Sequence, residues 1–286
     1  SYVLLGWAWS NIFSLFSSNH ILNITLFSAF CSALTSVVNS STFYSVLKFL
    51  SKNKTNDFKI YLASACSSLA MSFGLTFWNW SNTVEVYALQ ILCGSLMLNG
   101  FIKYSISRSY KNLTIAGIGY AAGLANHHLY MILFTPLILF FFSDNLLQNP
   151  EYTNKKRKKN KTNPIKSLLE IIKSRHFIYL TTLSTIIAVV FYLLMMIRAR
   201  NDFPFEFGNP DNLSRLWDHI TGKVYTQMLL ADEKSESFIF LKVPYFSKML
   251  FRQFLLFTPF LIAGIIYLIR NKLYRMLILI VSYSGF

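Results

Sequence analysis

The stretch His20–Leu47, HILNITLFSAFCSALTSVVNSSTFYSVL, contains no charged residue. A helix that crosses the roughly 30 Å hydrocarbon core of a bilayer needs about 20 mostly apolar residues, and this stretch is longer than that. Further uncharged runs follow along the chain at 60–77, 86–102, 113–143, 177–197 and 253–269. The sequence therefore predicts an all-α, polytopic transmembrane helical bundle.

Composition agrees with this class of protein. Of the 286 residues, 53% are hydrophobic and only 14% are charged, with a mean hydropathy of +0.41, whereas an ordinary soluble domain carries about 25% charged residues. A net charge of +15 would also suit a nucleic-acid-binding protein. Here, however, the basic residues lie between the apolar runs, so we expect cytoplasmic membrane loops, a lipid bilayer as partner and no nucleic acid.

The basic loops predict the sidedness of the bundle. Lys and Arg concentrate around 48–59, 103–111 and 155–161 and again after residue 269. Short Lys- and Arg-rich loops stay on the cytoplasmic side of a membrane, so we place these four loops inside. The turn near Trp78–Ser81 and the segment 198–248 are then outside, and most of the 27 basic residues are inside.

The run 113–143 is too long for one ordinary span and short for two. A single crossing would put the lysine cluster at 155–161 outside the cell membrane, against the positive-inside rule. Two short crossings hinged near Asn126-His127-His128 keep that cluster inside. We therefore predict a hairpin with this polar triplet at its outer tip.

These considerations predict one transmembrane domain fragment over 1–286, with about seven or eight membrane helices and an interfacial or truncated helix at 1–17. The predicted membrane segments are 20–48, 59–77, 84–103, 112–126, 128–143, 176–197, 250–269 and 273–286. A cytoplasmic basic loop is predicted at 150–175 and an extracytoplasmic loop at 198–248. The first residue is not methionine and the last lies in an apolar run, so we interpret the chain as an internal piece of a longer protein.

Three polar groups at the predicted outer face are candidate functional residues, because polar groups in or near a membrane are costly. Glu85 is either an interfacial carboxylate, solvated or capping a helix start where the helix dipole favours a negative charge, or a group that contacts a metal or a substrate or acts as a general base. His127 either lies in a polar turn or binds a phosphate or metal. Arg198 either snorkels to lipid headgroups or holds a phosphate or carboxylate.

The sequence lacks several common nucleotide-binding and catalytic motifs. There is no Walker, GxGxxG, HExxH or GxSxG pattern, and the three cysteines have no CxxC spacing. We therefore expect no domain that binds a water-soluble nucleotide.

Three blocks of sequence carry a family resemblance. They read Phe77-Trp78 with Val84-Glu85-Val86-Tyr87-Ala88-Leu89, then Gly123-Leu124-Ala125-Asn126-His127, then Arg198-Ala199 with Phe207-Gly208-Asn209-Pro210 and His219-Ile220-Thr221-Gly222-Lys223-Val224-Tyr225. In this order they resemble the bacterial and animal family of membrane protein O-mannosyltransferase-like proteins, which belongs to the GT-C class of glycosyltransferases. Val84 stands in place of the usual Ala, and Phe207 in place of the usual Trp.

The resemblance implies a GT-C-like bundle that transfers a sugar, with mannose as the first candidate. It implies a polyprenyl-phosphate sugar donor and an extracytoplasmic acceptor, either a protein Ser/Thr hydroxyl or a glycan, in the bacterial inner membrane or the endoplasmic reticulum. The resemblance implies no particular cofactor and allows a divalent metal. Donor- or substrate-binding roles are implied for Glu85, Tyr87, Asn126, His127, Arg198, Asn209 and His219.

The same resemblance implies a catalytic acidic residue upstream of Ser1, so we expect the chain as given to lack the catalytic base. Two other functions compete with the enzyme. A transporter or flippase of lipid-linked glycans predicts polar residues buried in mid-span and broken helices in paired halves. A structural scaffold predicts no clustering of Glu85, His127 and Arg198. Polar groups at the span ends and the lack of a sequence repeat favour the enzyme.

Overall fold

The computed structural model describes residues 2–51, 55–132, 134–142, 164–200, 209–223 and 258–271, together with residues 244, 248 and 252. Regular structure in this part of the chain is helical, without a strand. Two compact units are formed, one by Ser1–Phe73 and Phe77–Phe191, the other by Gly74–Thr76 and Tyr192–Phe286. The helices are α1 (Tyr2–Phe13), α2 (His20–Leu50), α3 (Asp57–Ser72), α4 (Leu75–Ser81), α5 (Val86–Ser107), α6 (Tyr110–Ile132), α7 (Thr135–Phe142), α9 (Pro164–Ile172), α10 (Arg175–Ala199), α11 (Leu213–Thr221) and α14 (Thr258–Arg270).

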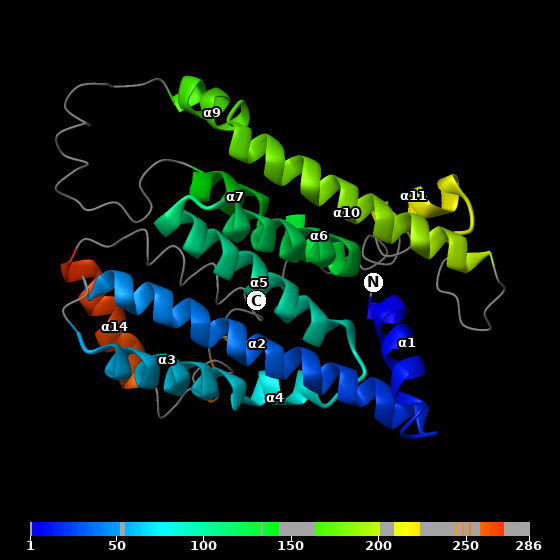
Figure 1. The fold of residues 1–286 in the computed structure, drawn as a ribbon, viewed down its shortest axis with the longest axis horizontal. Helices are drawn as coiled ribbons and strands as arrows, with labels where there is room; N and C mark the ends of the chain where they lie inside the picture. The colour runs from blue at the N-terminus through cyan, green and yellow to red at the C-terminus, as the bar shows by residue number, and fades with distance from the viewer. Residues whose placement is uncertain are drawn as a thin grey trace. The chain divides into compact units, whose positions relative to one another are not determined.

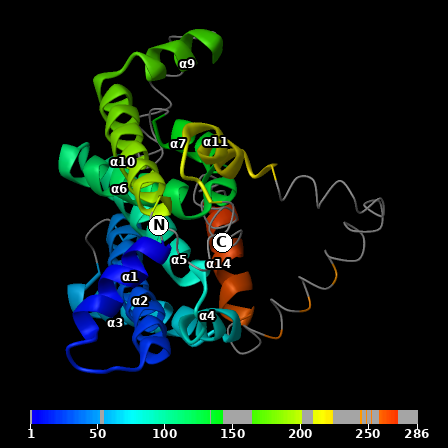
Figure 2. The same cartoon turned by 90° about the vertical axis from the view of Figure 1, so that its right-hand side faces the viewer.

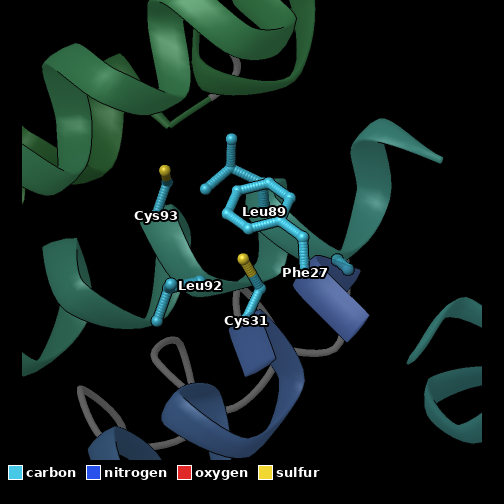
Figure 3. Close-up of a cluster of buried hydrophobic side chains, with 6 residues drawn as sticks. Phe27, Cys31, Leu89, Leu92 and Cys93 are labelled. Carbon is cyan, nitrogen blue, oxygen red and sulfur yellow. The ribbon is translucent and has the colours of Figure 1, made fainter. Parts of the chain in front are cut away.

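The first unit is built around α2, which lies between α3 and α5 (Figure 1). A buried apolar cluster joins the first half of α2 to the first half of α5 (Figure 3), and its members are Phe27, Cys31, Ala88, Leu89, Leu92 and Cys93. Further along both helices, Asn99 Nδ2 donates a hydrogen bond of 2.8 Å to Thr42 Oγ1. The two helices therefore run in the same direction.

The neighbours of α2 on its other sides are α3 and α1. Ser36 of α2 hydrogen-bonds Ser72 at the end of α3, whereas Lys48 Nζ lies 3.4 Å from the Asp57 carboxylate at the start of α3, so α3 returns antiparallel to α2. At the other end of α2, α1 lies against its first turns (Figure 2), where the Trp9 ring packs 5.6 Å from the Phe27 ring.

The contact between α5 and α6 is made by backbone as well as by side chains. A Cβ built on Gly119 would lie 2.6 Å from the backbone nitrogen of Met97, and one on Gly100 would meet the backbone of Ala116 even more closely. Glycine at these two positions therefore lets the antiparallel helices approach closely, as small residues do between membrane helices. On the far side of α6, Thr114 Oγ1 and Tyr179 Oη of α10 are 2.9 Å apart.

Basic side chains gather at one end of the first unit. Lys48 pairs with Asp57, and Lys103 Nζ near the end of α5 donates to Ser41 Oγ of α2 at 2.6 Å. The α5–α6 connection turns through Arg108, whose φ is 53°. These contacts place the loops at 48–59 and 103–111 at the same end, which is the arrangement that the positive-inside rule predicts.

The chain reverses direction at His127. This residue has non-helical angles, φ −149° and ψ 82°, inside α6. Beyond it, Met131 lies against Gly123 and Thr135 Oγ1 of α7 lies 2.9 Å from Tyr120 Oη. The segment after His127 thus runs back beside the segment before it, and the reversal falls where the sequence predicts a hinge.

Fewer membrane-length helices are found than the seven or eight predicted. Within the described ranges, α2, α5 and α10 are long and apolar enough to cross a bilayer, and the bent pair α3–α4 would make a fourth. The shortfall has a physical reason in α6, because the reversal at His127 divides it into two short pieces. Among the predicted segments, 273–286 lies outside the described residues, as do most of 150–175 and of 198–248.

The segment predicted as one crossing over 59–77 is bent. The helix ends at Ser72 and restarts as α4 at Leu75 with an angle of 72° between the two axes. The predicted outer turn at Trp78–Ser81 is therefore helical. Gly74 lies in the break, and glycine is a frequent cause of sharp kinks because it adds no side chain to hold the helix.

In the second unit, the short helix α11 lies within the segment 198–248 that the sequence assigns to a loop. Asn212 caps its first turn by accepting a hydrogen bond of 3.0 Å from the Arg215 amide, and Gly222 ends it with φ 65°. Asp211 binds Arg215 at 3.1 Å, and its carbonyl accepts from Arg200 Nε at 3.2 Å. These contacts tie α11 to the end of α10.

We predict that Gly119→Ala lowers the stability of the protein, because the added methyl group meets backbone atoms that cannot rotate away. Overpacking of this kind costs about 1–3 kcal/mol, which outweighs the roughly 1 kcal/mol gained by replacing a helical glycine with alanine. The midpoint of thermal unfolding in lipid nanodiscs measures the effect.

Gly264→Ala in α14 is the matched control, since a Cβ there meets no atom of the described residues within 4 Å. This variant should be as stable as the wild type or slightly more so. Equal melting temperatures for Gly119→Ala and Gly264→Ala would contradict the close backbone contact of α5 with α6.

Candidate functional site

The candidate site lies at the end of the first unit away from Lys48 and Lys103. There the start of α5 meets the reversal in α6, because the two helices are antiparallel. Four of the seven predicted site residues come from these two places, and they are Glu85, Tyr87, Asn126 and His127. The structure thus brings together two of the sequence blocks that carry the family resemblance, although about forty residues separate them.

Asn126 makes the direct connection between the two helices. Its Nδ2 donates to the backbone carbonyl of Val86 at 2.9 Å and to Oε1 of Gln90 at 3.1 Å. Both acceptors belong to the first turns of α5 and are one helical turn apart. Asn126 immediately precedes the non-helical residue of α6, so these two hydrogen bonds hold the reversal against α5.

Aromatic rings surround the imidazole of His127. Its ring is stacked with the Tyr87 ring at a centroid distance of 6.4 Å and meets the Tyr130 ring edge-on at 5.3 Å. The Tyr87 ring in turn lies 4.2 Å from the Trp80 ring of α4. Within the described part of the chain, the Nδ1 atom of His127 is buried without a hydrogen-bond partner.

Glu85 is the residue from which α5 begins. It is the N-cap with extended angles, φ −137° and ψ 152°, but its side chain makes no capping hydrogen bond, and it is exposed. Glu85 is therefore a solvated carboxylate at the helix start, one form of the first interpretation in the sequence analysis, and its side chain does not cap the helix. A carboxylate at this position is still favoured by the helix dipole, and its oxygens are accessible to a ligand.

Two residues of the site were missed by sequence reasoning. Gln90 is 2% exposed, and Trp80 was assigned to a turn. The signal for Gln90 was present in the sequence, because it is a polar residue within the uncharged run 86–102, and buried polar groups in membrane segments mark functional or interhelical contacts. Trp80 could not be assigned without knowing that α4 continues to Ser81.

The remaining predicted residues, Arg198, Asn209 and His219, belong to the second unit. Arg198 is half-buried in the last turn of α10, and Asn209 has a positive φ of 30°. Burial lowers the pKa of the His219 imidazole below its ordinary value of 6.5, because removal from water disfavours the charged ring. His219 is thus a neutral donor and acceptor at pH 7.

The residues of this site can form hydrogen bonds to an oxygen-rich ligand. Across the described ranges, no three or more His, Cys, Asp and Glu side chains gather in one place. The functional groups at the α5–α6 end are an exposed carboxylate, a buried imidazole, two side-chain amides and aromatic rings.

Comparison with known families identifies the class of protein. Residues 2–149, which span α1 to α7, match the family described as the N-terminal domain of the protein O-mannosyl-transferase TMEM260. Proteins of this class are glycosyltransferases, and the apolar helices α2, α5 and α10 agree with a membrane protein. The matched region contains Glu85, Tyr87, Asn126 and His127 and ends before Arg198.

The chain belongs to this TMEM260 family of protein O-mannosyltransferases, because the match covers more than half of its residues. The family resemblance drawn from the sequence blocks is thereby confirmed. Searches among the curated proteins and among the solved structures gave no match.

We predict that Asn126→Ala destabilises the protein by about 1–2 kcal/mol. Hydrogen bonds between membrane helices are worth about 0.6 kcal/mol on average, and leaving the Gln90 carbonyl buried without its donor adds to the loss. Thermal unfolding in nanodiscs measures the change.

Asn112→Ala is the control, because this amide lies at the opposite end of the same helix and makes one exposed hydrogen bond, to Ser107. It should change the unfolding midpoint by less than half as much. A larger loss of thermal stability in Asn112→Ala than in Asn126→Ala would show that Asn126 does not hold α6 to α5.

Proposed function

We propose that this protein transfers mannose from a polyprenyl-phosphate donor to a serine or threonine hydroxyl of a protein on the extracytoplasmic side of the membrane. Membership of a protein O-mannosyltransferase family supports the reaction class. The lipid donor is supported by the absence of a soluble nucleotide-binding motif from the sequence and by the position of the candidate site at the end of membrane-length helices.

One observation carries the proposal. The two family blocks in the first unit meet at a single place, where Asn126 binds α5 and the His127 ring stacks on Tyr87. This place is opposite to the end where Lys48 and Lys103 lie. Because basic loops are cytoplasmic, the meeting point belongs to the outer face, where a lipid-linked sugar and a secreted acceptor are both present.

The proposed reaction is an inverting displacement at the anomeric carbon. A carboxylate takes the proton of the acceptor hydroxyl as general base, the hydroxyl oxygen forms the new bond to the sugar, and the polyprenyl phosphate leaves with the electrons of the broken bond. As the bond breaks, negative charge builds up on the phosphate oxygens. Groups that donate hydrogen bonds to those oxygens lower the barrier.

The residues of this chain divide these tasks in the proposal. His127 is the donor to the departing phosphate, since its imidazole is held by rings and has a buried nitrogen without a described partner. Exposed Glu85 orients the acceptor or a divalent cation. For Arg198, Asn209 and His219, which belong to the second unit, donor binding is proposed from the family resemblance alone, and the Arg198 guanidinium suits bidentate phosphate binding.

A transporter of lipid-linked glycans remains the second candidate, because the spans contain buried polar residues and the pair α3–α4 is bent. These polar groups, however, bind one another between helices. Asn99 donates to Thr42, and Ser36 pairs with Ser72. Such contacts hold membrane helices together and do not outline a path for a substrate.

We predict that the double variant Glu85→Gln and His127→Ala in the full-length protein lowers mannose transfer by about 100-fold, which is the usual loss when a preorganised donor to a developing charge is removed. The assay follows radiolabelled mannose from polyprenyl-phosphate mannose to a Ser/Thr-containing acceptor protein in proteoliposomes.

His176→Ala serves as control, because this imidazole also stacks on a tyrosine ring, Tyr110 at 4.5 Å, but lies near Arg108 at the basic end of the bundle. Its transfer rate should stay within about twofold of the wild type. Undiminished transfer by the double variant would remove the proposed roles of Glu85 and His127, and lipid movement without sugar transfer would favour the transporter.

A further inference from the structure

Gln90 differs from the other buried amide of α5, Asn99. Both side chains are almost fully buried, with 2% and 5% of their surface exposed. The Asn99 amide donates to Thr42 and to the carbonyl of Val38, so it serves as an interhelical link. The Gln90 carbonyl accepts from Asn126, but its Nε2 is buried without a partner among the described residues.

The hydrogen bond from Asn126 to Gln90 acts on the reversal in α6. Asn126 Nδ2 is shared between the Gln90 side chain and the Val86 carbonyl. The residue after it, His127, has φ −149° and ψ 82°. These angles are not helical, so the regular hydrogen bonds of a helix do not hold them. Contacts from outside the helix must therefore fix them. Besides the stacking of the His127 ring on Tyr87, the nearest such contacts along the chain are the hydrogen bonds of Asn126.

The burial of an unpaired amide group is costly. A buried donor without an acceptor costs about 1–3 kcal/mol, and an apolar side chain of the same size would avoid that cost. A side chain that served only to fill space between α5 and α6 would not need this polarity. Polarity is required for the role of the Gln90 carbonyl, because this carbonyl is one of the two acceptors that hold Asn126.

We propose that Gln90 is a positioning residue for the transferase site, which acts through Asn126 to fix the backbone at His127 and so the direction of the imidazole. The catalytic effect of Gln90 rests on the proposed function, whereas its geometric role does not. Gln90 sets where His127 lies before substrate binds, in the way that groups behind a reacting residue orient it.

Two variants separate the acceptor from the rest of the side chain. Gln90→Met keeps the length and volume but has no acceptor for Asn126. Gln90→Glu keeps a carboxyl oxygen in the acceptor position and loses the amide N–H groups. Asn99→Leu is the control, since it removes a buried amide from the same helix at a place that does not touch the reversal.

The first measurement is hydrogen exchange of the backbone amides at 127–132 in the full-length protein in nanodiscs, which requires no activity. Gln90→Met should exchange there at least about tenfold faster than the wild type, while Gln90→Glu exchanges like the wild type. Asn99→Leu should lower the unfolding midpoint without changing exchange at 127–132. Unchanged exchange in Gln90→Met, or faster exchange in Gln90→Glu alone, would overturn the proposal.

The second measurement is the steady-state transfer of mannose from polyprenyl-phosphate mannose. A misplaced catalytic group slows the chemical step, so Gln90→Met should lose about tenfold in kcat with KM for the donor within about twofold, and Gln90→Glu should restore kcat. Equal loss in both variants would overturn the positioning role, because it would point to the amide N–H groups. If exchange responds as expected but the wild type transfers no mannose, the proposed function fails and the geometric role of Gln90 stands.

Discussion

The close approach of α5 and α6 is the constraint on which the first unit depends. At Gly100 and Gly119 the two backbones come so near that a single methyl group would collide with main-chain atoms. Two antiparallel helices held this closely have their ends in fixed register. The connection at Arg108 is then at one end, and the reversal at His127 is level with the start of α5, where Asn126 can reach the Val86 carbonyl.

Many polar side chains in this unit form hydrogen bonds between helices. In the interior of the bundle they find partners on neighbouring helices, as Asn99 does with Thr42, because an unsatisfied polar group in hydrocarbon is costly. A few buried polar atoms have no partner among the described residues, among them Asn23 Oδ1, Ser105 Oγ and two atoms near the reversal. Gln90 Nε2 and His127 Nδ1 are buried without partners within the described ranges, and local departures from good hydrogen bonding are typical of places where a protein binds a ligand.

Charge made much of the fold predictable. Because Lys and Arg resist crossing a membrane, the loops at 48–59 and 103–111 could be assigned to one end, and the structure has them there. The run 113–143 suggested a reversal at Asn126–His128, since its length suits neither one span nor two, and the chain does reverse at His127. The bend after Ser72 was missed, because an uncharged run looks the same whether its helix is straight or broken at Gly74.

By itself the sequence determined the family, through its sequence blocks, and the membrane class. It also predicted that Glu85, Tyr87, Asn126 and His127 belong to one face, because hydropathy and charge are properties that each residue carries with it. Only the tertiary structure decided which atoms meet. The bonds from Asn126 to α5, the stacking of His127 on Tyr87 and the burial of Gln90 depend on the register of two helices. That register follows from backbone contact at two glycines, and such a contact depends on the space between helices, which hydropathy and charge do not encode.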